Sequence, residues 1–109
     1  MTKFITMATI ITLAILPPSV TLNAPASASG GGSMEASGSS DGGESSTRID
    51  VYHDGVQLTS GVTITWSGND FSIAIDPVPD HDPEGDNIIE IDVSSGATSV
   101  SAAVTITKA

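Results

Sequence analysis

Carboxylate side chains are the groups in this sequence whose spacing could do chemistry. Seven of the 13 acidic residues lie between Asp76 and Asp92, and four of them stand at alternate positions: Asp80, Asp82, Glu84 and Asp86. Ca²⁺ takes six to eight oxygen ligands, many of them carboxylates on one tight loop. The spacing therefore makes these four residues a candidate calcium site, and Ca²⁺ is the one cofactor that the sequence suggests.

The same acids also fit a plain solvated loop, stiffened by Pro77, Pro79 and Pro83. The run D-x-D-x-E-G resembles the first half of an EF-hand loop, but its twelfth position would be Ile91 instead of a bidentate Glu. An EF-hand is therefore a poor fit. A calcium site on a loop between strands and a solvated acidic loop remain as the two alternatives.

The residues needed for catalysis do not form a recognisable motif. The sequence has two histidines, His53 and His81, and neither belongs to a serine-nucleophile pattern such as G-x-S-x-G. Asp80 and Asp82 could imitate the two carboxylates of a glycosidase, but they share one loop and have no groove to hold a sugar. With His81 they could instead hold a transition metal. No phosphate-binding glycine motif follows a strand. We expect a protein that is not an enzyme.

Length and composition limit the class of protein. The 109 residues allow one domain, and the formal net charge of −10 argues against nucleic acid and anionic membrane surfaces as partners. The absence of Cys excludes a disulfide scaffold, a Cys-ligated zinc, a thiol nucleophile and a lipidated Cys.

Residues 1–28 have the pattern of a secretory signal peptide. A short basic start precedes an uncharged apolar run from Phe4 to Leu16, which is too short to span a bilayer as a helix. The triplet Ala26-Ser27-Ala28 then supplies small residues typical of a cleavage site. We expect cleavage after Ala28 and no stable membrane insertion afterwards, with an uncleaved anchor as the alternative.

Residues 29–47 predict a flexible linker. Gly and Ser fill 13 of these 19 positions, and Met34 is the only sizeable apolar side chain. Such a segment cannot bury enough apolar surface to offset its ordering entropy. We therefore expect a disordered spacer.

Residues 48–109 alternate apolar and polar side chains with the period of a β-strand. Turn signals separate six such stretches, beginning with Asp54-Gly55, a strong hairpin signal. The pattern predicts an all-β fold, a small antiparallel sandwich of about six strands. Trp66 and Phe71 flank one tight turn and are expected to form a cross-strand aromatic pair, with an exposed sugar-stacking platform as the alternative.

The best-matching stretch for a known family is Gly85 to Val93, which reads GDNIIEIDV. Together with Val51 to Gly55, Phe71 to Ile75 and the final strand, it resembles the bacterial Ig-like sandwich modules of secreted glycosidases and surface adhesins. The resemblance implies an Ig-like β-sandwich over residues 48–109 that serves as a spacer, an adhesin unit or a binding accessory.

These observations predict an exported, non-enzymatic Ig-like interaction module at or outside the cell surface, with the periplasm as an alternative location. Its partner would be an extracellular protein or a glycan. One rival is a self-assembling structural subunit, a homo-oligomer joined through open strand edges, because Val100–Thr107 is uncharged and β-prone. Another is a calcium-dependent carbohydrate-binding module.

Overall fold

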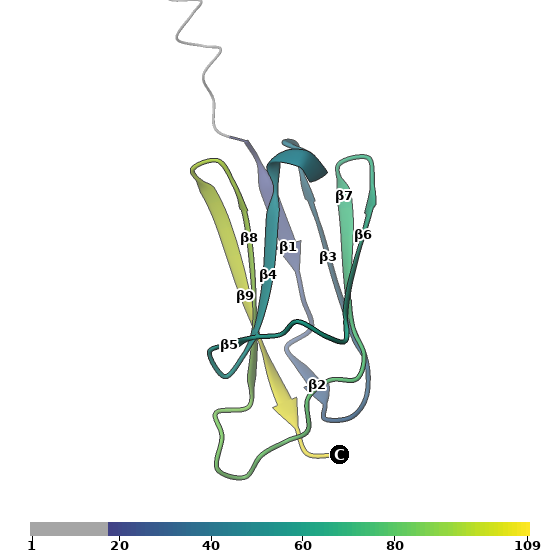
Figure 1. The fold of residues 1–109 in the computed structure, drawn as a ribbon, viewed down its shortest axis with the longest axis vertical. Helices are drawn as coiled ribbons and strands as arrows, with labels where there is room; N and C mark the ends of the chain where they lie inside the picture. The colour runs from purple at the N-terminus through teal and green to yellow at the C-terminus, as the bar shows by residue number, and fades with distance from the viewer. Residues whose placement is uncertain (1–17) are drawn as a thin grey trace, which may run out of the picture.

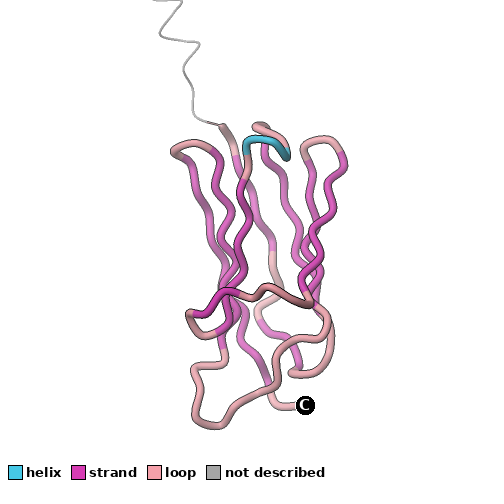
Figure 2. Tube along the Cα trace, in the orientation of Figure 1, coloured by secondary structure: helices cyan, strands magenta, loops and turns pink. Residues whose placement is uncertain are grey.

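The computed structural model describes residues 18–109, which form two β-sheets packed against each other (Figure 1). Strands account for nearly all of the regular structure, and one 3-10 turn lies at one end of the sandwich (Figure 2). In chain order the elements are β1 (Val20–Asn23), β2 (Ser27–Ser29), β3 (Met34–Ser40), η1 (Glu44–Ser46), β4 (Arg48–His53), β5 (Val56–Gln57), β6 (Val62–Ser67), β7 (Asp70–Ile75), β8 (Ile88–Ser95) and β9 (Thr98–Thr107).

The two sheets have the strand orders β1-β3-β7-β6 and β2-β9-β8-β4-β5. Neighbouring strands are antiparallel except β2 and β9, which run parallel. The chain changes sheets between Asn23 and Ser27, because β1 pairs with β3 whereas β2 pairs with β9. The predicted all-β sandwich is confirmed.

The six strands expected after residue 47 are all present as β4 to β9. The hairpin predicted at Asp54-Gly55 joins β4 and β5, and both residues have positive φ, 49° and 86°. This conformation suits the tight turns that match the twist of two paired strands. Alternating burial along β7 and β8 likewise agrees with the sequence pattern.

The expected linker at residues 29–47 is wrong. β3 lies inside a sheet, paired with β1 on one side and β7 on the other, and its Met34, Ala36 and Ser40 are buried. Its small side chains give β3 the composition of a flexible spacer, but in the fold they allow close packing against the neighbouring strands. A Cβ at Gly38 would collide with the Thr21 carbonyl oxygen and would lie 2.6 Å from Phe71 Cζ.

The domain also begins earlier than predicted. Val20 in β1 and Ala28 in β2 are 9% and 8% exposed and belong to the core, so a boundary after Ala28 would cut through the fold. The basic start and the apolar run to Leu16 lie outside the described residues. Within residues 18–109, no helix is long and apolar enough to cross a membrane.

The core fills the space between the sheets with aliphatic side chains. Its centre consists of fully buried residues on β7, β8 and β9: Ile73, Ile75, Ile89, Ile91, Val93, Val104 and Ile106. Val78, on the loop after β7, is equally buried at 1% exposure. Because this core is continuous between the sheets, it fixes the loops and edges on which any site must be built.

Candidate functional site

The acidic residues of the candidate calcium site lie on the long loop between β7 and β8. Asp80, Asp82, Glu84 and Asp86 are all exposed there. Across residues 18–109, no three His, Asp or Glu side chains are grouped so that they could hold a metal ion. The geometry gives the calcium site no support, and calcium binding stays a prediction.

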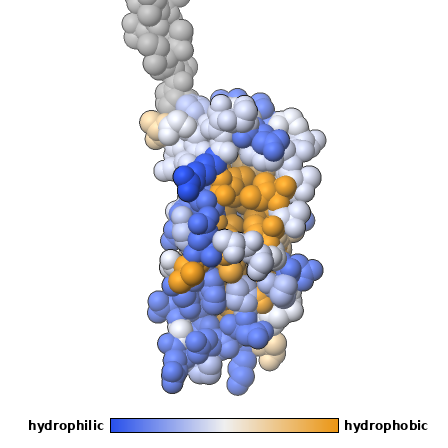
Figure 3. Space-filling view, viewed as in Figure 1, coloured by the Kyte–Doolittle hydropathy of each residue, from blue (hydrophilic) through white to orange (hydrophobic). Residues whose placement is uncertain are grey.

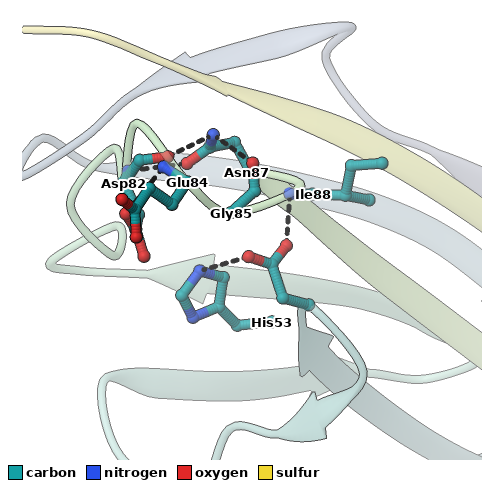
Figure 4. Close-up of polar contacts among 7 residues, drawn as sticks. His53, Asp82, Glu84, Gly85, Asn87 and Ile88 are labelled. Atoms are coloured by element: carbon teal, nitrogen blue, oxygen red, sulfur yellow. Dashed lines mark hydrogen bonds and ion pairs between the residues drawn. The ribbon is translucent and has the colours of Figure 1, made fainter.

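The loop is held instead by the side chain of Asn87, which is 8% exposed (Figure 4). Its Oδ1 accepts a hydrogen bond from the Asp82 N–H at 2.7 Å, and its Nδ2 donates to the carbonyls of Asp82 at 2.8 Å and Gly85 at 2.9 Å. The Asp82 carboxylate accepts from the Glu84 N–H at 3.0 Å. A buried amide thus satisfies the backbone groups of the turn.

Asp54 joins the β4–β5 turn to the start of β8. Its N–H donates to the Ile88 carbonyl at 3.0 Å, and its carboxylate accepts from the Ile88 N–H at 2.9 Å. The hydrogen bond from Ile88 holds the pKa of Asp54 below its usual value, with a smaller contribution from the charge of His53. His53 Nε2 lies 3.6 Å from the Asp54 carboxylate and is buried without a hydrogen-bond partner.

The outer face of the β4–β8 pair carries a shallow acidic depression of about 460 Å³. Its lining consists of four carboxylates with Tyr52 and Ile88 at their side: Asp54, Asp86, Glu90 and Asp92. Hydrogen bonding and charge from Asp92 raise the pKa of Glu90. This face attracts cations in general, but its carboxylates come from the β4–β5 turn, the β7–β8 loop and β8, and no three of them are grouped to hold a metal ion.

Another hollow is a groove of about 290 Å³ between β4 and β6, with polar and apolar lining residues. Its lining residues are Glu44, Thr47, Ile49, Ile64 and Trp66. The groove exists because β5 has only two residues, which pair with Tyr52 and His53 and leave the first part of β4 uncovered. Figure 3 shows apolar surface exposed over this region of the sandwich.

Strand alternation places Ile64 and Trp66 on the same face of β6, but neither side chain is fully buried. Ile64 is 37% exposed and Trp66 is half-buried, although Ile73 and Phe71, which pair with them on β7, are buried. The signal that could have revealed the groove is the short distance from the Asp54-Gly55 turn to Gly61, which leaves room for only a brief β5.

The open edge predicted at Val100–Thr107 exists only in part. β9 pairs with β8 over residues 98–105 and with β2 over residues 105–107, so within residues 18–109 its residues 98–104 have a neighbouring strand on one side only. The outer strands of the other sheet are β1 and β6. Of these, β6 is the longer, with six residues against four.

The described residues contain no catalytic arrangement that the hydrogen bonds reveal. Over residues 18–109, no histidine is hydrogen-bonded to a serine or threonine hydroxyl. Phe71 is 3% exposed, so it forms no sugar-stacking platform with Trp66.

Comparison with solved structures shows which fold this is. The chain superposes on titin domain I81 with a TM-score of 0.58 at 9% identity, covering 85% of this chain and 99% of that one. It superposes on the M1 domain of titin with a TM-score of 0.54 at 14% identity (83% and 94% covered), and on the Ig7 domain of Dscam1, isoform 5, with 0.52 at 15% (85% and 97% covered). A scan of protein-family models and a search of curated protein sequences find no match.

The chain therefore has an immunoglobulin-like fold, and its sheets correspond to the usual two of that architecture. Antibody domains join their sheets by a disulfide packed against a Trp, whereas this chain has no Cys, and β4 carries Val51 at its buried position. Many such domains also carry a Tyr at the start of the strand equivalent to β8, hydrogen-bonded to backbone a few residues upstream. Asn87 makes that type of contact here with Asp82 and Gly85.

Proposed function

We propose that this chain is an exported, non-enzymatic Ig-like interaction module that binds a protein partner at or outside the cell surface. The observation that carries the proposal is the groove in which Ile49, Ile64 and Trp66 lie beside Glu44 and Thr47. It borders β6, an outer strand that no other strand of residues 18–109 covers. Exposed apolar side chains gathered at one place are typical of interaction sites.

A protein partner suits this surface better than a glycan. An outer strand presents a row of free backbone N–H and C=O groups, which an added strand can pair with. Sugar rings, in contrast, stack on exposed aromatic faces, and Phe71 is buried behind Trp66. The calcium-dependent carbohydrate-binding alternative has no observation in its favour.

Export is supported by the sequence before the domain. The basic start and the apolar run from Phe4 to Leu16 have the order of a secretory leader. They precede Val20, the first residue of β1, so the leader can be removed without removing any strand of residues 18–109. We place the cleavage no later than Val20, and the mature protein in the medium or at the cell surface, with the periplasm as the alternative compartment.

Cell fractionation tests this proposal. The full chain with a C-terminal tag is produced in bacteria beside two variants of the apolar run, Ile10→Arg and the matched control Ile10→Leu. We expect the wild type and Ile10→Leu outside the cytoplasm and Ile10→Arg inside it, since a charge disrupts the apolar run. Wild-type protein confined to the cytoplasm would contradict export. An intact mass that corresponds to a mature chain starting at Ser29 would contradict cleavage no later than Val20.

A further inference from the structure

Strand β6 is an outer strand without the usual protection against pairing with another chain. Its six residues, VTITWS, include no charged residue and no Pro. They pair one to one with β7 from Val62↔Ile75 to Ser67↔Asp70, so the strand contains no bulge. Natural outer strands are commonly blocked by charge, Pro, a bulge or a covering loop. β6 has none of the first three, and one side of it borders the groove.

The free backbone groups of β6 belong to particular residues. Ser67 pairs with Asp70 across a turn of only two residues, Gly68 and Asn69, and such a pair must be a hydrogen-bonded one. Hydrogen-bonded pairs alternate along an antiparallel ladder, so Ser67, Thr65 and Thr63 direct their backbone groups toward β7. The N–H and C=O groups of the remaining residues, Val62, Ile64 and Trp66, therefore point outward.

The same three residues place their side chains on the groove side of the sheet. Val62, Ile64 and Trp66 lie opposite Ile75, Ile73 and Phe71, all of which face the core. Free backbone groups and incompletely covered apolar side chains thus coincide. An extended segment placed beside β6 would pair with these backbone groups and cover these apolar side chains.

We propose that the segment placed there is β6 of a second copy of this chain, antiparallel and centred on Ile64. In this register Ile64 faces its own copy, Val62 faces Trp66, and Thr63 faces Thr65. In this register each residue faces a residue on the same side of the sheet. The pairs combine β-branched, aromatic or threonine side chains, which are favourable across two strands. The strand is complementary to itself, as a two-fold interface requires.

Charge and area also favour this contact. The described residues carry 13 acids against Arg48 and Lys108, so two copies repel each other except where a charge-free surface meets another. β6 itself carries no charge, and Glu44 is the one acidic residue that lines the groove beside it. A six-residue strand pair is about 20 Å long. A contact of this length lies at the small end of specific protein interfaces. The dimer should therefore be reversible and should form over the micromolar range.

The homodimer rests on the proposed interaction role and is independent of export. A chain that is exported but monomeric would overturn the homodimer alone, whereas a dimer retained in the cytoplasm would overturn export alone. The two proposals therefore fail in different experiments.

Sedimentation velocity of the purified full chain tests the homodimer between 1 and 300 μM. We expect the mass to rise from monomer to dimer across this range. Thr65→Lys should weaken the dimer at least tenfold, because it places an ammonium group on the outer strand. Thr105→Lys, an exposed threonine on the inner strand β9, makes the same change in net charge and should leave the dimer intact. A wild type that stays monomeric at 300 μM, or equal effects of the two lysines, would overturn the proposal.

Disulfide trapping checks the register without depending on the lysine variant. The chain has no Cys, so a single introduced Cys can link only to a second copy. In a hydrogen-bonded antiparallel pair the Cα atoms lie about 5.5 Å apart, within reach of a disulfide. Ile64→Cys should therefore oxidise to a covalent dimer much faster than Ile88→Cys, whose side chain has similar exposure, 40% against 37%. Equal oxidation rates would contradict pairing at Ile64.

Discussion

The rings of Trp66 and Phe71 contact each other across the β6–β7 turn, with centroids 5.2 Å apart and planes tilted by 54°. Phe71 is buried in the core, while Trp66 is half-buried and lines the groove. The pair therefore connects the packed interior to the surface proposed for binding. Tilted aromatic pairs at this distance add stability to a strand pair beyond that expected from the area they bury. The groove therefore lies beside a stabilised part of the sandwich.

Replacing Asn87 tests whether this side chain organises the β7–β8 loop. Asn87→Ala removes three hydrogen bonds to part-buried backbone groups and puts Ala at a φ of 60°. We expect a loss of about 2–3 kcal/mol in the free energy of unfolding, measured with chemical denaturant. Asn87→Gly should cost less, since Gly tolerates this φ. Asn69→Ala, in an exposed turn, is the control and should have little effect on stability. An effect of Asn87→Ala as small as that of the control would show that Asn87 does not organise the loop.

Replacing Gly38 tests the close approach of β3 to its neighbours. Gly38→Ala adds a methyl group that meets the Thr21 carbonyl oxygen and the ring of Phe71. We expect the free energy of unfolding to fall by about 1–3 kcal/mol, as for an overpacked core. Ser37→Ala, one residue earlier and exposed, should change it by less than about 0.5 kcal/mol. If both variants unfold like the wild type, β3 does not lie between β1 and β7.

The depressed pKa of Asp54 predicts a pH dependence of stability. A carboxylate whose pKa is lower in the folded state stabilises the fold above its unfolded pKa, and that contribution disappears as the pH falls through the folded value. The ordinary pKa of the group is 3.8. Asp54→Asn should therefore be less stable than the wild type at pH 7, and the difference should shrink below about pH 4. Denaturant melts of the two proteins at several pH values give the difference directly, and a gap that is constant with pH would contradict it.

Calcium should not stabilise the protein if Asn87 holds the acidic loop. We expect equal melting temperatures in millimolar Ca²⁺ and in chelator at matched ionic strength, since Asp80, Asp82, Glu84 and Asp86 do not converge. A higher melting temperature in Ca²⁺ that Asp82→Asn abolishes would restore the calcium site. Mg²⁺ at the same concentration controls for screening of the acidic surface.

The alternation of residue types was sufficient to predict the fold from Arg48 onward. Large β-branched residues such as Ile73 and Ile91 lie on one face of their strands, so their burial could be foreseen. β3 could not be predicted, because residues such as Gly38 are small where neighbouring atoms approach closely. Composition alone does not distinguish such a strand from a linker. Ala28 shows the same ambiguity, since a small residue suits both a cleavage site and a buried strand.

The site was less predictable than the fold. The sequence drew attention to the acids, which the structure leaves dispersed, and it overlooked Asn87, whose role depends on the conformation of the backbone around it. The groove at Ile64 depends on what fails to cover β6, and strand alternation carries no information about the opposite sheet.

The fluorescence of Trp66 shows whether the groove beside β6 is a binding surface. Trp66 is the only tryptophan in the chain, so the signal reports the groove alone. Across the concentration range in which sedimentation detects dimers, we expect a blue shift of the emission and less quenching by iodide. An emission maximum and a quenching constant that stay unchanged while the mass doubles would show that the copies meet elsewhere, and would contradict the account.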